Sequence, residues 1–171
     1  LYTNIPAAGP EGGEQAFAQA LEKRVDKTLP TNILVLMLSF VLSENIFTFN
    51  GQLYRQNIGT AMGTKLAPTY ANLFMAWLED TKLLGLWSGT KPIMWRRFID
   101  DIFFIWPGSI TELELFISHL NSQHSSIKFT ATYDVQQRSV PFLDTVVSID
   151  SENYIQTNVY KIGRASCRER V

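Results

Sequence analysis

The sequence predicts an α+β fold in which an antiparallel sheet packs on helices. Helix-like and strand-like segments follow one another in blocks instead of strictly alternating, as is typical of this class. Asn50-Gly51 stands between two runs of alternating apolar and polar residues, the strongest short signal for a β-hairpin. A second hairpin over residues 93–106 and alternating segments after residue 126 predict further antiparallel strands.

Length and composition suit a single domain. With 171 residues, of which 46% are hydrophobic, the chain can bury one core. The apolar run over residues 33–42 is too short to span a bilayer. The first residues lack the basic start and apolar segment of a secretory signal. We therefore expect no membrane partner and no secretion, and the start at Leu1 indicates a fragment truncated at its N-terminus.

The last ten residues, 162–171, show neither apolar periodicity nor turn signals. They resemble the translation of a common sequencing-library adapter, so we expect a non-native tail after a domain over residues 1–161. The only cysteine, Cys167, lies in this tail, which excludes disulfides and cysteine metal sites from the domain. Without the tail's three Arg and one Glu, 12 basic and 15 acidic residues remain, a formal net charge of −3. This balance argues weakly against a nucleic-acid binder, unless basic parts lie outside the fragment.

Two helices and the Asn50-Gly51 hairpin are predicted in the first part of the domain. Residues 14–25 show an amphipathic helical pattern, with apolar residues at four-residue spacing: Phe17, Leu21 and Val25. Residues 31–44 are apolar nearly all round, which predicts a buried helix. The hairpin follows over residues 46–56.

A glycine-containing loop then leads into a third helix. We expect this helix over residues 69–84, with one apolar side formed by Leu73, Trp77 and Leu84. Gly59 and Gly63 precede it and leave the backbone bare, so a ligand could approach the free N–H groups of the helix start. A plain loop and helix cap is the alternative interpretation of this stretch.

The second part is predicted to contain a hairpin, a helix and three strands. Ser109 and Glu112 form a capping box for a helix that runs to about Gln123. Its apolar stripe consists of Leu113, Phe116, Ile117 and Leu120. Three antiparallel strands are expected after it, over residues 127–133, 140–149 and 154–161.

Two adjacent aspartates, Asp100 and Asp101, lie inside the apolar stretch W-R-R-F-I-D-D-I-F-F-I-W over residues 95–106. The run after them suits a strand buried on both faces, where an unpaired carboxylate would cost several kcal/mol. A divalent cation would compensate that cost, and both carboxylates can approach one ion if they lie at the tip of a hairpin. A solvated Ile-Asp-Asp turn is the alternative.

Three segments in order resemble the palm and part of the fingers of a reverse transcriptase, closest to the Penelope-like retroelements. They are L-Y-T-N-I-P over residues 1–6, G-T-A-M-G-T-K-L-A-P-T-Y-A-N-L-F-M over 59–75, and F-I-D-D over 98–101. The resemblance covers nearly all of residues 1–161. It implies that Asp100 and Asp101 are catalytic and bind metal, and that the first catalytic aspartate falls four residues before Leu1.

The resemblance implies further site residues. Tyr2 would stack under the incoming sugar, and Met62-Gly63 would contact the nucleotide where other reverse transcriptases have Gln-Gly. The segment Phe142, Leu143 and Asp144 would grip the primer. Lys128 matches either a late-palm lysine that protonates pyrophosphate or a surface lysine.

The implied activity is that of an RNA-directed DNA polymerase, a nucleotidyltransferase of a retrotransposon. It would use two Mg²⁺ ions, or Mn²⁺ in their place, with an RNA template, a DNA primer and deoxynucleoside triphosphates. The parent protein would act in the nucleus or cytoplasm of a eukaryotic host, and the fragment itself would be inactive without the first aspartate. The alternatives are a palm that copies RNA into RNA, and a decayed or repurposed copy that binds nucleic acid without catalysis.

Overall fold

The computed structural model describes residues 1, 4–6, 12–57, 59–61 and 64–160. The chain divides into two units: unit 1 is Leu1–Met94 with Phe104–Phe129, and unit 2 is Trp95–Phe103 with Thr130–Val171. The described residues form a mixed α/β structure with small antiparallel sheets, in agreement with the predicted α+β class. The expected tail over residues 162–171 lies outside the described part of the chain. No described helix is both long and apolar enough to cross a bilayer.

Helix α1 spans Gly13–Glu22 and ends three residues earlier than predicted. Val25 is fully exposed beyond its end, so the predicted apolar stripe does not extend to this residue. The Asp26 carboxylate accepts hydrogen bonds from both the backbone N–H and the hydroxyl of Thr28. Such local bonds offer the backbone an alternative to the helix, which explains the early end.

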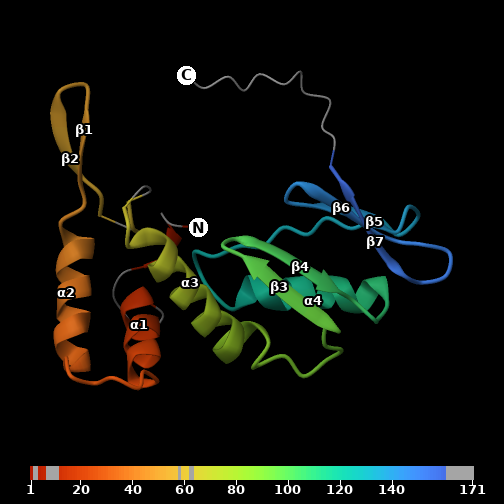
Figure 1. Cartoon of the computed structure of the whole chain (residues 1–171), viewed down its shortest axis with the longest axis horizontal. Coiled ribbons are helices and arrows are strands. Elements are labelled where there is room, and N and C mark those ends of the chain that lie inside the picture. Colours follow the sequence, from red (N-terminus) through yellow and green to blue (C-terminus); the bar gives the residue numbers. More distant parts are fainter. Residues whose placement is uncertain (2–3, 7–11, 58, 62–63, 161–171) are drawn as a thin grey trace. The chain divides into compact units, whose positions relative to one another are not determined.

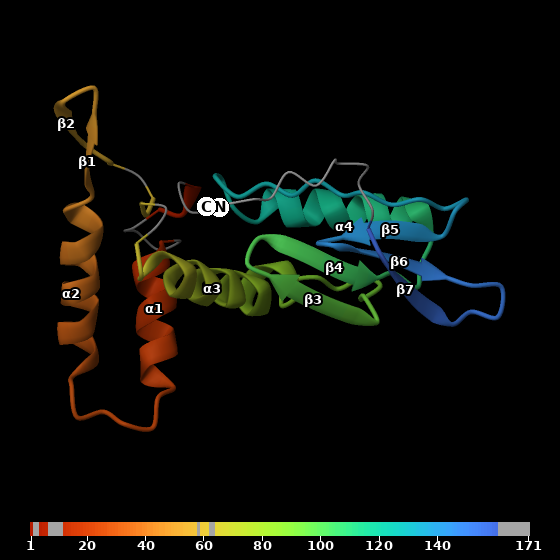
Figure 2. The ribbon, with the colours of Figure 1, turned by 45° about the horizontal axis from the view of Figure 1, so that its top comes forward.

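Helix α2 spans Thr31–Ser43, close to the predicted bounds, but the prediction that it is buried was wrong. Only Leu38 and Leu42 are buried, while five large apolar side chains are exposed: Ile33, Leu36, Met37, Phe40 and Val41. Helix α1 lies alongside α2 in both views of unit 1 (Figures 1 and 2) and contacts it. The described part of unit 1 therefore covers one side of an otherwise apolar helix.

The Asn50-Gly51 hairpin is confirmed. Strand β1 (Ile46–Phe49) pairs with β2 (Gln52–Arg55) in the register Phe49↔Gln52. Asn50 has φ 49° and Gly51 has φ 76°, the positive values that a two-residue hairpin turn of type I′ requires. The hairpin extends beyond the end of α2 (Figure 1), and all residues of both strands are exposed.

Helix α3 spans Ala67–Leu78, two residues earlier than predicted at its start, and a π-helical turn, η2 (Glu79–Leu83), continues it. The predicted apolar side was wrong, because the buried residues are Ala67, Tyr70, Ala71, Phe74, Met75 and Leu78. In η2 the Leu84 N–H donates to the Glu79 carbonyl five residues back. This wider turn changes the phase of the helix, so Leu83 is buried instead of Leu84.

Tyr70 of α3 joins two helices in the core of unit 1. Its hydroxyl lies so close to Gly13 of α1 that a Cβ at this glycine would overlap the ring. Burial raises the pKa of the hydroxyl, and no hydrogen-bond partner for it exists among the described residues. Gly13 therefore allows close contact between α1 and α3.

Helix α4 spans Ile110–Ser122 and confirms the predicted capping box. The Ser109 hydroxyl accepts from the Glu112 N–H at 3.3 Å, and the Glu112 carboxylate accepts from the Ser109 N–H at 2.9 Å. Bonds from Ser109 and from the Thr90 hydroxyl hold the pKa of Glu112 below its ordinary value. Three of the predicted stripe residues are buried, namely Leu113, Phe116 and Leu120.

Unit 2 contains a three-stranded antiparallel sheet of β5 (Ser139–Phe142), β6 (Thr145–Ile149) and β7 (Ile155–Val159) (Figure 2). The three strands predicted from the sequence were partly wrong. Residues 127–133 form no strand, and residues 140–149 form a hairpin instead of one strand. Asp144 is the only common turn residue in the Leu143-Asp144 turn, and the apolar Leu143 takes the positive φ, so the turn signal in the sequence is weak there.

Candidate functional site

The two aspartates lie at the tip of a hairpin, as predicted. Strand β3 spans Met94–Phe98 and strand β4 spans Asp101–Ile105, so Ile99 and Asp100 form the turn between them. Asp101 is the first residue of β4, and both carboxylates are exposed. The expected burial of the following run on both faces was wrong, because residues 102–106 are only half-buried.

The turn that carries Asp100 is strained. Ile99 has φ 57°, in the left-handed region that a β-branched residue rarely adopts. Residues held in such conformations cost about 1–3 kcal/mol and cluster at functional sites. The Arg97 guanidinium donates a 3.0 Å hydrogen bond to the Ile99 carbonyl, which helps to hold the turn.

The predicted primer-binding segment also lies at a hairpin tip. Phe142 ends β5, and Leu143 and Asp144 form the turn to β6, with Leu143 at φ 53°. The Phe142 ring lies against the Phe103 ring of β4, with centroids 5.5 Å apart. Unit 2 therefore brings the strand that follows the aspartates together with the hairpin that carries Phe142, Leu143 and Asp144.

The other predicted site residues divide into two groups. Tyr2, Met62 and Gly63, predicted to bind the nucleotide, lie outside the described residues. Lys128 donates hydrogen bonds to the Asn121 carbonyl at 2.7 Å and to the His124 carbonyl at 3.1 Å. These bonds satisfy carbonyls at the C-terminal end of α4, which supports the interpretation of Lys128 as a structural surface lysine.

The residues that the structure describes contain no group of three or more His, Cys, Asp and Glu side chains suited to an ion. Asp100 and Asp101 are two adjacent carboxylates and fall below that number. Mg²⁺ keeps several waters and is commonly bound by one or two carboxylates together with substrate phosphates. The two carboxylates at the hairpin tip are therefore oxygen donors of the kind that Mg²⁺ accepts.

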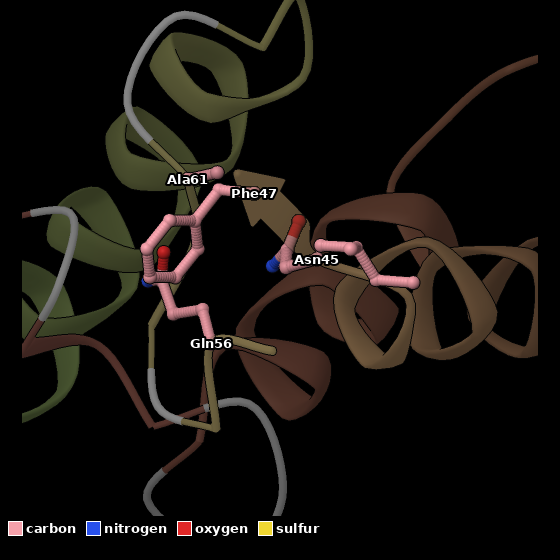
Figure 3. Close-up of a pocket in the computed structure, with 5 residues that line it drawn as sticks. Asn45, Phe47, Gln56 and Ala61 are labelled. Atoms are coloured by element: carbon pink, nitrogen blue, oxygen red, sulfur yellow. The ribbon is translucent and has the colours of Figure 1, made fainter. Parts of the chain in front are cut away.

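A cavity in unit 1 was not predicted from the sequence. It has a volume of about 270 Å³ and is lined by Asn45, Ile46, Phe47, Gln56 and Ala61 (Figure 3). The Asn45 carbonyl accepts a 2.8 Å bond from the Gln56 N–H, which closes the base of the β1–β2 hairpin. The hairpin was evident in the sequence, but the cavity forms only because Ala61 approaches from the following loop.

No protein-family model, curated protein or solved structure matches this chain.

Proposed function

We propose that the chain is the palm, with part of the fingers, of an RNA-directed DNA polymerase of the Penelope-like type. One observation carries the proposal: Asp100 and Asp101 are adjacent, exposed carboxylates at the tip of a strained hairpin turn. Asp is itself a common turn residue, but a turn without a further role would have no need of a β-branched residue at positive φ. The motif order in the sequence supports the same function.

Asp100 and Asp101 would hold Mg²⁺ at the place where the primer end and the incoming nucleotide meet. The ions, when bound, supply charge neutralisation and activation of the primer hydroxyl. The chain itself positions the two carboxylates. Asp100 lies in the turn, and Asp101 is the first residue of strand β4. Since phosphoryl transfer depends mainly on positioning and electrostatics, a hairpin tip that presents two carboxylates is a suitable support for these groups.

The β5–β6 turn would hold the primer in this proposal. Phe142 lies against Phe103, only two residues after Asp101 along β4. The contact couples the orientation of the β5–β6 hairpin to that of the strand carrying the aspartate. The same proposal includes Tyr2, which would stack under the incoming sugar, and Met62-Gly63, which would contact the nucleotide. It also includes action in the nucleus or cytoplasm of a eukaryotic host.

Primer extension on an RNA template with Mg²⁺ and deoxynucleotides tests the proposal. The protein is the chain lengthened at its N-terminus by the first motif that the resemblance implies. We expect Asp100→Asn to reduce extension by more than about 100-fold, because even groups that only support metal ligands are worth about 10–100-fold. Asp134→Asn is the matched control, since Asp134 is an exposed carboxylate of unit 2 that accepts bonds only within its own turn.

Near-normal extension by Asp100→Asn, with intact folding, would refute the assignment. If the wild type and all variants bind the nucleic acid but none extends the primer, the result would instead support the non-catalytic nucleic-acid-binding alternative.

A further inference from the structure

The cavity at the base of the β1–β2 hairpin has the chemistry of a nucleobase site. We propose that it binds one unpaired base of a single-stranded nucleic acid, held against Phe47 and hydrogen-bonded by Asn45. This inference rests on the proposed function, because it assumes that the protein works on a nucleic-acid strand. It adds a contact that the motif resemblance does not assign.

Asn45 supplies a fixed, unused acceptor. The residue is 9% exposed, and its Nδ2 donates a 3.2 Å bond to the Leu42 carbonyl, which fixes the orientation of the amide. The Oδ1 atom accepts no hydrogen bond from the described residues. In Figure 3 the Asn45 amide lies between Ile46 and the Phe47 ring, with its nitrogen nearer than its oxygen to Phe47 and Gln56. Amide side chains of this type pair with the donor and acceptor groups of base edges, adenine above all.

Phe47 supplies a stacking surface. Its ring stacks on Tyr54 across the hairpin, with centroids 5.7 Å apart and planes at 21°. Tyr54 therefore holds the ring in place while 51% of the residue stays exposed. Proteins that bind single strands combine such aromatic surfaces with hydrogen bonds to the edges of splayed-out bases.

Size and charge favour a base of a strand over a free nucleoside triphosphate. The cavity volume of about 270 Å³ is below the roughly 300–1,000 Å³ of sites for larger ligands. All five lining residues are uncharged, so they neutralise no triphosphate. Arg55 pairs with Ile46 across the hairpin, and its Nε bonds the Ser43 carbonyl at 2.9 Å. This places one cation beside the cavity for a strand phosphate.

The test measures the affinity of the full chain for a strand of abasic sugar-phosphate units that carries a single adenine. A wholly abasic strand of equal length reports the affinity that does not depend on the base. We expect Phe47→Ala to weaken binding of the adenine strand about tenfold or more, as for other aromatic stacking contacts, and to leave the abasic strand unchanged. Phe49→Ala is the matched control, because Phe49 lies on the same strand and also contacts Tyr54 but does not line the cavity.

Phe47→Leu, which keeps an apolar side chain, guards against misfolding and should weaken binding of the adenine strand in the same way. Equal effects of Phe47→Ala and Phe49→Ala would overturn this inference alone and leave the polymerase proposal standing. If free dATP displaces the adenine strand at a concentration as low as that at which the adenine strand itself binds, the assignment of the cavity to a nucleic-acid strand would be overturned. Loss of extension in Asp100→Asn tests the proposed function independently of these results.

Discussion

Two hairpins of this molecule, β1–β2 and β3–β4, each have a two-residue turn with a residue at positive φ, but the turn residues differ. The β1–β2 turn uses Asn50-Gly51, two residues that tolerate positive φ at little cost. The β3–β4 turn uses Ile99-Asp100, and there the residue at positive φ is β-branched. The first turn follows local preference, whereas the second violates it at the position that presents the carboxylates. Such a violation is expected where a turn serves a function beyond folding.

The two units also differ in the size of their apolar cores. Every fully buried large apolar side chain among the described residues belongs to unit 1, from Ile5 to Ile127. The described part of unit 2 is held mainly by strand pairing, turn hydrogen bonds and the Phe103–Phe142 contact. Stability is therefore concentrated in unit 1, and the candidate catalytic groups lie in the unit with the smaller core.

Placing the Ile-Asp pair of the β3–β4 turn in the β1–β2 turn should have the largest effect on hairpin stability. Asn50→Ile with Gly51→Asp places a β-branched residue at positive φ and should cost the hairpin about 2 kcal/mol. Because both strands are exposed and a two-stranded hairpin is marginal, β1 and β2 should open locally while the unit 1 core stays folded. Hydrogen exchange of the hairpin amides measures this effect, and unchanged protection would contradict it.

Relieving the strain in the other turn should have a smaller effect of opposite sign. Ile99→Gly should stabilise the β3–β4 hairpin by about 1 kcal/mol, the relieved strain less the extra entropy of glycine. Hydrogen exchange of the β3 and β4 amides measures the gain. Ile102→Gly, the same change inside strand β4, should instead destabilise the hairpin. If both substitutions destabilise, Ile99 is not strained.

Removing the hydrogen bond that supports the strained turn should have the next largest effect on hairpin stability. Arg97→Ala deletes the bond to the Ile99 carbonyl and should cost the hairpin about 1 kcal/mol. Arg96→Ala is the control, since the exposed Arg96 bonds only the carbonyl of the preceding Trp95. Equal protection loss in the two variants would show that Arg97 has no specific role at the turn.

The smallest expected effect concerns the other locally encoded feature, the α4 capping box. The folded-state pKa of Glu112 lies below its ordinary 4.5, so its contribution is present above that pH and is lost as the pH falls through the lowered value. Glu112→Gln keeps an acceptor for Ser109 but cannot titrate, so stability should fall less steeply below about pH 4.5. Acid unfolding of the variant beside Glu114→Gln measures this difference, and identical acid profiles would contradict it.

Features encoded by neighbouring residues could be predicted from the sequence. The Asn50-Gly51 turn and the Ser109–Glu112 capping box each depend on residues at most three positions apart. The aspartate tip was also predictable, because carboxylates inside an apolar run require either a turn or a partner.

Features that depend on tertiary contacts could not be predicted. The apolar composition of α2 gives no sign that the described chain covers only one side of the helix. The π-helical turn after Leu78 changes which residues of α3 face the core, and composition does not reveal it. The Leu143-Asp144 turn has one common turn residue, Asp144, and the apolar Leu143 takes the positive φ, so the sequence resembles a single strand where the structure has a hairpin.

Mn²⁺ binding is the sharpest test of a metal site at the β3–β4 tip, because it requires neither substrate nor turnover. The measurement is paramagnetic broadening of backbone amide signals by substoichiometric Mn²⁺, an ion that carboxylate oxygens also bind. We predict selective broadening at residues 99–102, removed by Asp100→Asn with Asp101→Asn and reversed by excess Mg²⁺, with no such change in Asp134→Asn. Broadening that spreads over the exposed carboxylates of the chain, or that persists in the double variant, would contradict the assignment of this hairpin as a metal-binding site.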